Sequence, residues 1–180
     1  MPRTIPIINQ SDASELDQLL FKEYYSLEQL VELAGFTCAS SWYKLMQPIC
    51  EGMKLSLTNI RILVLVGPGN NGNDALVMAR HIALWGGNVH IIAPKMNYPL
   101  SDSTPQKISD KLLHVAVQCG CQFISNGLEY IEKIQNNRYN ECGNNDVLTP
   151  HWVVDGIFGF SFRADSIQDI RAPFDSYIKF

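Results

Sequence analysis

The chain has 180 residues and a mass of 20.3 kDa, which is enough for one hydrophobic core and too little for two ordinary domains. Apolar residues make up 46% of the chain, it contains 12 Gly and 9 Pro, and no apolar run approaches the roughly 18 residues of a membrane span, so collagen-like, disordered and membrane-spanning classes are excluded. The net charge of −4, without a basic stripe, argues against nucleic-acid binding through the phosphate backbone.

The cysteines and the N-terminal segment bear on the compartment. Cys38, Cys50, Cys119, Cys121 and Cys142 form no CxxC pair, which fits reduced thiols better than a disulfide framework. The first 18 residues contain no apolar core of a secretory signal. We expect a cytoplasmic protein, with the mitochondrion as the alternative.

The N-terminal region is predicted to be helical. Apolar residues recur at mostly helical spacing from Ser14 to about Gly35, which indicates two helices that meet near Tyr25 and Ser26. Ser26 is expected to cap the second helix, and Gly35 to end a turn. Further helix is expected from there to Pro48.

The middle of the chain predicts a βαβ unit. The run IRILVLV, which begins at Ile60, is typical of a strand buried on both faces in a parallel sheet. A glycine-rich turn follows, and then a helix that is expected to begin at Asn73 or Asp74 and to stop at Gly86. The segment VHIIA, from Val89, predicts the second strand.

The same alternation continues with less contrast toward the C-terminus. The pattern predicts helices over residues 108–117 and 128–134, and strands over 122–124 and 152–155. The Asn-rich segment 135–150 predicts a surface loop. Strands that alternate with helices predict a doubly wound α/β sheet with right-handed crossovers.

A glycine-rich turn follows the first predicted strand, at the edge where open α/β sheets bind ligands. Gly67, Gly69 and Gly72 formally satisfy the GxGxxG pattern, in which backbone amides approach a phosphate. The dinucleotide interpretation is weakened because the second strand offers no acidic residue for a ribose hydroxyl, and no Gly-Lys-Ser/Thr of a P-loop follows. The alternative is a tight turn that merely connects strand to helix.

The polar residues of this turn favour a binding site over a bare connection. Asn70 and Asn71 carry amides that can both donate and accept hydrogen bonds. Asp74 is expected near a helix N-terminus, where the helix dipole favours negative charge.

A second polar segment follows the strand predicted over 152–155. Asp155 could hold a hard cation together with an Asn carbonyl and backbone carbonyls, or its carboxylate could cap neighbouring backbone amides. Arg163 could meet a phosphate or be a solvated surface charge, and Asp165 is similarly ambiguous. The four histidines lack metal-binding spacing, and we assign them structural roles.

Three segments of the chain resemble a known family. The segment ILVLVGPGNNGNDALVMARHIALWG resembles the first strand, loop and helix of the NAD(P)H-hydrate epimerases, also called the YjeF N-terminal domain. VVDGIFGFSFRAD resembles the second signature of that family, and LDQLLFKEYYSLEQLVELAG resembles its N-terminal helices. The resemblance runs from about Leu16 to Phe174. The animal branch, which includes the apolipoprotein A-I-binding proteins, looks most similar.

The resemblance implies an isomerase that epimerises the hydrated nicotinamide ring of NADH or NADPH (NADHX or NADPHX) at the C6 hydroxyl, so that a partner NAD(P)H-hydrate dehydratase can repair the S form. It implies a Rossmann-like three-layer αβα sandwich with a mostly parallel sheet and N-terminal helices, a homodimer, and a potassium ion on Asn71 and Asp155. The animal branch adds apolipoprotein A-I as a partner. The implied substrate contacts are Asn70, Asn71, Gly72, Asn73, Asp74, Gly159, Phe160, Ser161, Phe162, Arg163, Ala164 and Asp165.

The sequence departs from the family pattern in its loop and at its end. The family loop reads NNGGDG, so Asn73 and Ala75 are expected to add side chains where the backbone approaches a ligand, and Ala164 also replaces a usual glycine. We expect one domain of this kind over residues 1–180, without the family's C-terminal strands and their Asp-Ile-Pro-Ser-Gly-like motif. Asp74 and Asp165 then remain as candidate catalytic groups. The alternative function is a catalytically impaired or truncated homologue that acts as a nucleotide- or protein-binding module.

Overall fold

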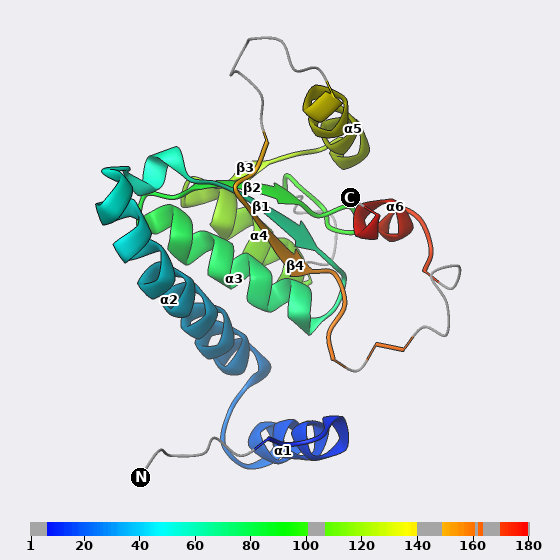
Figure 1. Ribbon diagram of the computed structural model, residues 1–180. Helices are drawn as coiled ribbons and strands as arrows, with labels where there is room; N and C mark the ends of the chain where they lie inside the picture. Colours follow the sequence, from blue (N-terminus) through cyan, green and yellow to red (C-terminus); the bar gives the residue numbers. More distant parts are fainter. Residues whose placement is uncertain (1–6, 101–106, 140–148, 161, 164–169, 180) are drawn as a thin grey trace.

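A parallel sheet forms the centre of the molecule (Figure 1). The computed structural model describes residues 7–100, 107–139, 149–160, 162–163 and 170–179. Within these residues the sheet has the strand order β3-β2-β1-β4, and every neighbouring pair is parallel. The strands are β1 (Arg61–Val66), β2 (Asn88–Ile92), β3 (Gln122–Phe123) and β4 (Trp152–Gly156).

Strand β1 is buried on both faces, as its uninterrupted apolar run predicts. Ile62, Val64 and Val66 pack into the cluster on one face of the sheet, and Leu63 and Leu65 pack into the cluster on the other. Successive side chains of a strand point to opposite faces, so only a strand covered from both sides reads as a continuous apolar run. Helices must therefore cover both faces.

The helices form two layers, one on each face of the sheet (Figure 1). One layer holds α2 (Leu27–Met53), α3 (Asn70–Leu84) and α4 (Ile108–Gln118), with α3 in contact with both of the others. The other holds α5 (Gly127–Tyr139) and α6 (Phe174–Ile178). This confirms the predicted α/β class and the αβα sandwich. No helix among the described residues is long and apolar enough to cross a bilayer.

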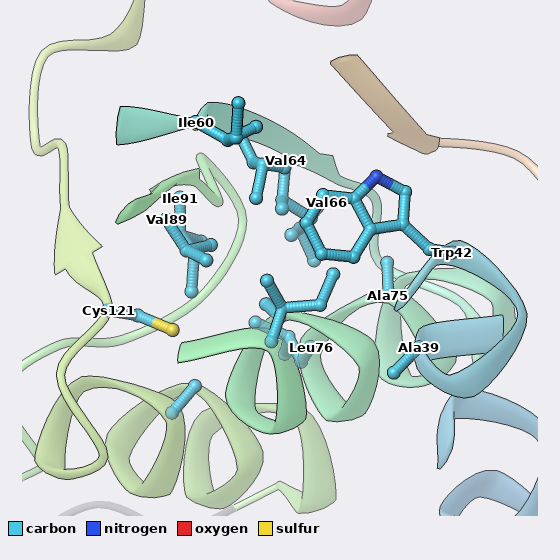
Figure 2. Packing of buried hydrophobic residues seen from close by; sticks show 14 of the residues in the cluster. Ala39, Trp42, Ile60, Val64, Val66, Ala75, Leu76, Val89, Ile91 and Cys121 are labelled. Atoms are coloured by element: carbon cyan, nitrogen blue, oxygen red, sulfur yellow. The ribbon is translucent and has the colours of Figure 1, made fainter. Parts of the chain in front are cut away.

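Helix α2 packs on α3 and reaches the core of the sheet through Trp42. Figure 2 shows the indole of Trp42 lying over Val66, with Ala39 and Ala75 beside it. Trp42 is only 6% exposed. Burial of an aromatic side chain of this size is among the larger stabilising contributions in a small core, so α2 is anchored firmly to the sheet.

The N-terminal helices meet where the sequence predicts. Helix α1 (Gln10–Glu23) ends before Ser26, which caps α2 in a reciprocal capping box. The Ser26 side chain accepts from the Gln29 amide at 3.3 Å, and the Gln29 side chain accepts from the Ser26 amide at 2.8 Å.

The expectation that Gly35 ends a turn is wrong, because α2 continues unbroken through it and through Pro48. A Cβ atom on Gly35 would lie 2.5 Å from the Val77 Cβ and 2.6 Å from the Asp74 carbonyl oxygen. Gly35 therefore permits close packing of α2 on α3, a role that local sequence does not reveal.

Two other boundaries differ from the prediction. Helix α3 begins at Asn70 rather than at Asn73 or Asp74, so the asparagines lie inside the helix. Helix α5 extends to Tyr139, into the segment predicted as a loop. A short 3-10 helix at Leu57–Asn59 leads into β1.

Candidate functional site

The candidate site lies where the order of the strands reverses. The chain moves from β1 to β2 to β3 in one direction across the sheet, with α3 and α4 on one face, and then returns to β4 on the far side of β1. Val66 is paired with Gly156, and the Gly67 amide donates to the Gly156 carbonyl at 3.0 Å. The segments that follow β1 and β4 therefore lie side by side, at the switch point where open α/β sheets bind ligands.

Packing within the protein explains two of the three glycines in the GxGxxG pattern. A Cβ on Gly67 would lie 1.8 Å from the Ile157 carbonyl oxygen, and a Cβ on Gly72 would lie 2.1 Å from the Gly67 carbonyl oxygen. Both contacts are with the protein's own backbone, so the tight-turn interpretation holds for these two positions. Gly69 differs, because a Cβ there would meet nothing within 4 Å and the residue borders an open cleft.

A cleft of about 770 Å³ opens beside this turn, which is a volume typical of small-molecule sites. The first turns of α3 and the segment after β4 contribute predicted site residues to its lining, namely Asn70, Asn71, Asp74, Gly159 and Phe160. The cleft thus brings together residues from both of the polar segments that the sequence singles out.

Helices α1 and α2 supply the other walls of the cleft. The α2 wall is mostly apolar and includes Leu30, Val31 and Ala34. The α1 wall includes Asp17 and Gln18, which the sequence analysis did not identify as site residues. The only available signal was a polar stripe at helical spacing on α1, and such a stripe is usually a solvated face.

Asn71 connects α3 to the segment after β4. Its side-chain nitrogen donates to the Phe158 carbonyl at 2.9 Å. A Cβ on Gly159 would lie 3.6 Å from the Asn71 Cβ, so the two segments are in van der Waals range here. This hydrogen bond uses one of the two N–H donors of the amide and orients the side chain, so the amide oxygen and the second N–H can serve a ligand.

Asp74 is the carboxyl group of the cleft with a strongly shifted pKa. Burial, and then the nearby negative charge of Asp17, raise the pKa of the Asp74 carboxyl from 3.8 to about 6. Asp74 is the fifth residue of α3, so the expectation that it lies at the helix N-terminus is wrong. A carboxyl group that titrates close to neutral pH is suited to accept and return a proton.

The expected intrusion of Asn73 and Ala75 into the site is also wrong. Asn73 is 4% exposed and Ala75 is 5% exposed, and neither lines the cleft. Ala75 belongs to the core shown in Figure 2. The carboxamide oxygen of Asn73 is buried and has no hydrogen-bond partner among the described residues. Because α3 begins at Asn70, its helical turn carries the residues at 70, 71 and 74 toward the cleft and those at 72, 73 and 75 toward the protein.

The segment after β4 combines a capping carboxylate with aromatic side chains. Asp155 accepts a hydrogen bond from the Ile157 amide at 2.9 Å, which is the contact that the capping interpretation predicts. The rings of Phe158 and Phe162 stack at 3.8 Å between centroids. Phe160 is 59% exposed at the cleft.

Arg163 contacts the N-terminal helix, since its guanidinium donates to the Gln10 side chain at 3.4 Å. The predicted site residues Ser161, Ala164 and Asp165 lie outside the described residues.

Polar contacts between Glu32 of α2 and the α3 residues Arg80 and His81 link the two helices; we call these three residues the polar clamp. Glu32 forms an ion pair with Arg80, and its carboxylate lies 2.8 Å from the His81 Nε2. Partial burial acts to raise the pKa of Glu32, but hydrogen bonds from His81 and Arg80 outweigh it and hold the pKa below its usual value. His81 thus has a structural role, as the sequence analysis assigns.

Comparisons with known proteins agree with this architecture. A family model described as "YjeF-related protein N-terminus" matches residues 27–179. An NAD(P)H-hydrate epimerase from Dictyostelium discoideum is 35% identical over 177 residues, which is 97% of this chain and 61% of that protein. The crystal structure of yeast ynu0 is similar with a TM-score of 0.68 at 27% identity, over 97% of this chain and 64% of that one. The chain therefore spans less than two thirds of the length of either protein.

Proposed function

The chain belongs to the family of YjeF-related protein N-termini, and from this premise we propose that it is an NAD(P)H-hydrate epimerase. Such an isomerase interconverts the R and S forms of hydrated NADH and NADPH. The main structural support is Asp74, whose carboxyl group has a pKa of about 6 and lies in a cleft of about 770 Å³ at the switch point of the sheet. The 35% identity to a known epimerase supports it.

Asp74 is the proposed proton acceptor and donor. Its carboxylate takes the proton of the C6 hydroxyl while the C6–N1 bond breaks, the C6–O bond becomes a carbonyl, and the electron pair of the broken bond stays on N1, which takes a proton from water. Rotation about the bond to C6 and closure on the other face reverse these steps, with Asp74 returning its proton to the oxygen. The half-buried position of Asp74 keeps both protonation states accessible near neutral pH.

The neighbouring residues are proposed to hold the substrate. The amides of Asn70 and Asn71 can bind its polar groups, and the exposed ring of Phe160 offers a flat apolar surface beside them. Phe162 and Arg163 are also proposed substrate contacts. So are Ser161, Ala164 and Asp165, which lie outside the described residues. Gly72 and Asn73 are buried behind the cleft, so their contribution is to shape this turn of α3.

Potassium is the proposed cofactor, with Asn71 and Asp155 as ligands. The donor set fits a hard cation, since both residues offer oxygen atoms at the adjacent carboxyl ends of β1 and β4. Among the described residues, no group of three or more His, Cys, Asp or Glu side chains is placed to hold a metal ion. When bound, the ion would supply positive charge next to the substrate.

The proposed partners follow from family resemblance. They are a second copy of the chain in a homodimer, an NAD(P)H-hydrate dehydratase that consumes the S epimer, and apolipoprotein A-I. The cytoplasm is the proposed compartment, with the mitochondrion as the alternative.

The proposal is tested by following NADPH recovery from the R epimer of NADPHX in potassium buffer, with an S-specific dehydratase in excess. We expect the wild-type protein to accelerate recovery above the spontaneous rate. Asp74→Asn should lower turnover by about 100-fold or more, because it removes the proton acceptor. Glu15→Gln, at an exposed position of α1, is the matched control and should leave turnover unchanged.

Two results would contradict the proposal. Failure of a folded wild-type sample to accelerate recovery would favour a binding module without catalysis. Unchanged turnover in Asp74→Asn would exclude Asp74 as the catalytic group.

A further inference from the structure

Helix α1 forms one wall of the cleft with a polar face. Ser14, Asp17, Gln18 and Phe21 line the cleft, and their spacing of three, four and seven residues places them on one side of the helix. No residue of α1 is buried, and Leu16 and Leu19, which do not line the cleft, are about half exposed. A helix docked only by apolar contacts would turn its leucines inward. Instead, α1 presents mainly hydrogen-bonding groups to the cleft.

The first residue of α1 makes polar contacts with the segment after β4. The Gln10 side-chain nitrogen donates to the Phe160 carbonyl at 2.6 Å, and its side-chain oxygen accepts from Arg163. Figure 1 shows α1, in blue, set apart from the layered body of the molecule. Gln10 thus joins the N-terminal end of α1 to a segment that itself lines the cleft.

The charges along the cleft indicate which part of a ligand it accepts. The described lining residues include two carboxyl groups, Asp17 and Asp74, and no Lys or Arg. Asp17 lies close enough to Asp74 for its charge to act on that group. Two acidic side chains disfavour a phosphate, whereas hydroxyl and carboxamide groups can donate hydrogen bonds to them.

We propose that α1 is a substrate-recognition wall, on which Asp17 and Gln18 bind the uncharged nicotinamide riboside end of the substrate while its phosphates lie outside the cleft. This inference rests on the proposed function and adds to it an orientation of the substrate and two binding residues. The nicotinamide riboside end carries the ribose hydroxyls and the carboxamide, which are the donors that the two acceptor side chains require.

The orientation is tested by calorimetry, in which two fragments of the substrate are titrated separately into the 180-residue protein. Reduced nicotinamide riboside is the uncharged probe, and ADP-ribose is the phosphate-bearing probe. The test variant is Asp17→Ala, and the matched control is Glu15→Ala, at an exposed position of the same helix that does not line the cleft. Alanine favours helix at both positions, so α1 is preserved.

We expect Asp17→Ala to weaken binding of the reduced riboside about tenfold and to leave ADP-ribose unchanged, because a hydrogen bond to a charged group is lost. Glu15→Ala should bind both probes as the wild type does. The proposal is overturned if the wild type does not bind the riboside, if the two variants behave alike, or if the loss falls on ADP-ribose. Binding requires no turnover, so a protein that binds as expected but fails the epimerase assay contradicts the proposed function and not this inference.

Discussion

Helices α1 and α2 line the same cleft but are held in place by different forces. Helix α2 buries six residues against the sheet and α3, whereas α1 buries none and makes polar contacts with the segment after β4 through Gln10. One wall of the site is therefore part of the hydrophobic core, and the other is a largely solvated helix. Helix α2 therefore contributes most to stability, whereas α1 is the helix to which we assign substrate recognition as a proposal.

Truncation of one apolar residue on each helix should show how differently α1 and α2 contribute to stability. Trp42→Ala on α2 should lower the free energy of unfolding by about 3–5 kcal/mol, because it removes a buried aromatic ring and leaves a cavity. Leu19→Ala on α1, where the side chain is 51% exposed, should cost less than about 0.5 kcal/mol. Urea unfolding followed by circular dichroism measures both, and equal losses would refute the distinction.

The close packing of α2 on α3 is tested at Gly35. Gly35→Ala should lower the free energy of unfolding by about 1–3 kcal/mol, because the added Cβ would overlap Val77 and the Asp74 carbonyl. Gly52→Ala is the control on the same helix, since a Cβ there meets nothing within 4 Å. The control should be neutral or stabilising by up to about 1 kcal/mol, as expected for alanine in a helix. Similar values for the two variants would show that the helices are not in tight contact.

The desolvated carboxyl of Asp74 makes stability depend on pH. Its pKa is raised from 3.8 to about 6, so the native state binds more protons than the unfolded state in this window and stability falls as the pH rises through it. Asp74→Asn should therefore match the wild type below about pH 4 and exceed it above pH 6 by on the order of 1 kcal/mol, allowing for solvent around this half-buried group. Urea unfolding at both ends of the window measures the difference. A variant less stable than the wild type at pH 7.5, roughly 1.5 units above that pKa, would contradict the account.

Loss of the contacts of Glu32 with Arg80 and His81 should change the free energy of unfolding less than the other test substitutions. The pH dependence of this change should be opposite to that of Asp74. Glu32→Gln should cost about 0.5–1 kcal/mol at neutral pH, because the ion pair with Arg80 is partly exposed to solvent. The pKa of Glu32 is lowered in the folded state, so its contribution is present above the unfolded value of 4.5 and is lost as the pH falls below it. Thermal unfolding of both proteins at pH 7 and about pH 3 tests this, and a constant difference would argue against it.

The elements that local patterns specify could be predicted from the sequence. The apolar run of β1 predicts a strand covered on both faces, and Ser26 with Gln29 caps α2 as expected for these residue types. The role of Gly35 could not be predicted, because it depends on contacts with Val77 and Asp74, some 40 residues away along the chain.

The sequence predicts which segments form the candidate site, but not which of their side chains point into the cleft. Asn70, Asn71 and Asp74 do line the cleft, as the polar turn suggests. Asn73 does not, because α3 starts three residues earlier than its sequence signals indicate, and that shift turns the side chain toward the interior. Asp17 was missed because its place in the cleft depends on how α1 docks, which no local pattern encodes.

The proposed role of Asp74 as proton acceptor in the cleft can be tested through the pH dependence of kcat/KM for the R epimer. We expect kcat/KM of the wild type to be constant above pH 6 and to fall about tenfold per pH unit below it, since this ratio reports the pKa of the free enzyme. The Asp74→Asn variant should have a low kcat/KM that does not fall further below pH 6. A wild-type kcat/KM that does not fall below pH 6, or an Asp74→Asn variant that shows the same fall, would exclude Asp74 as the proton acceptor.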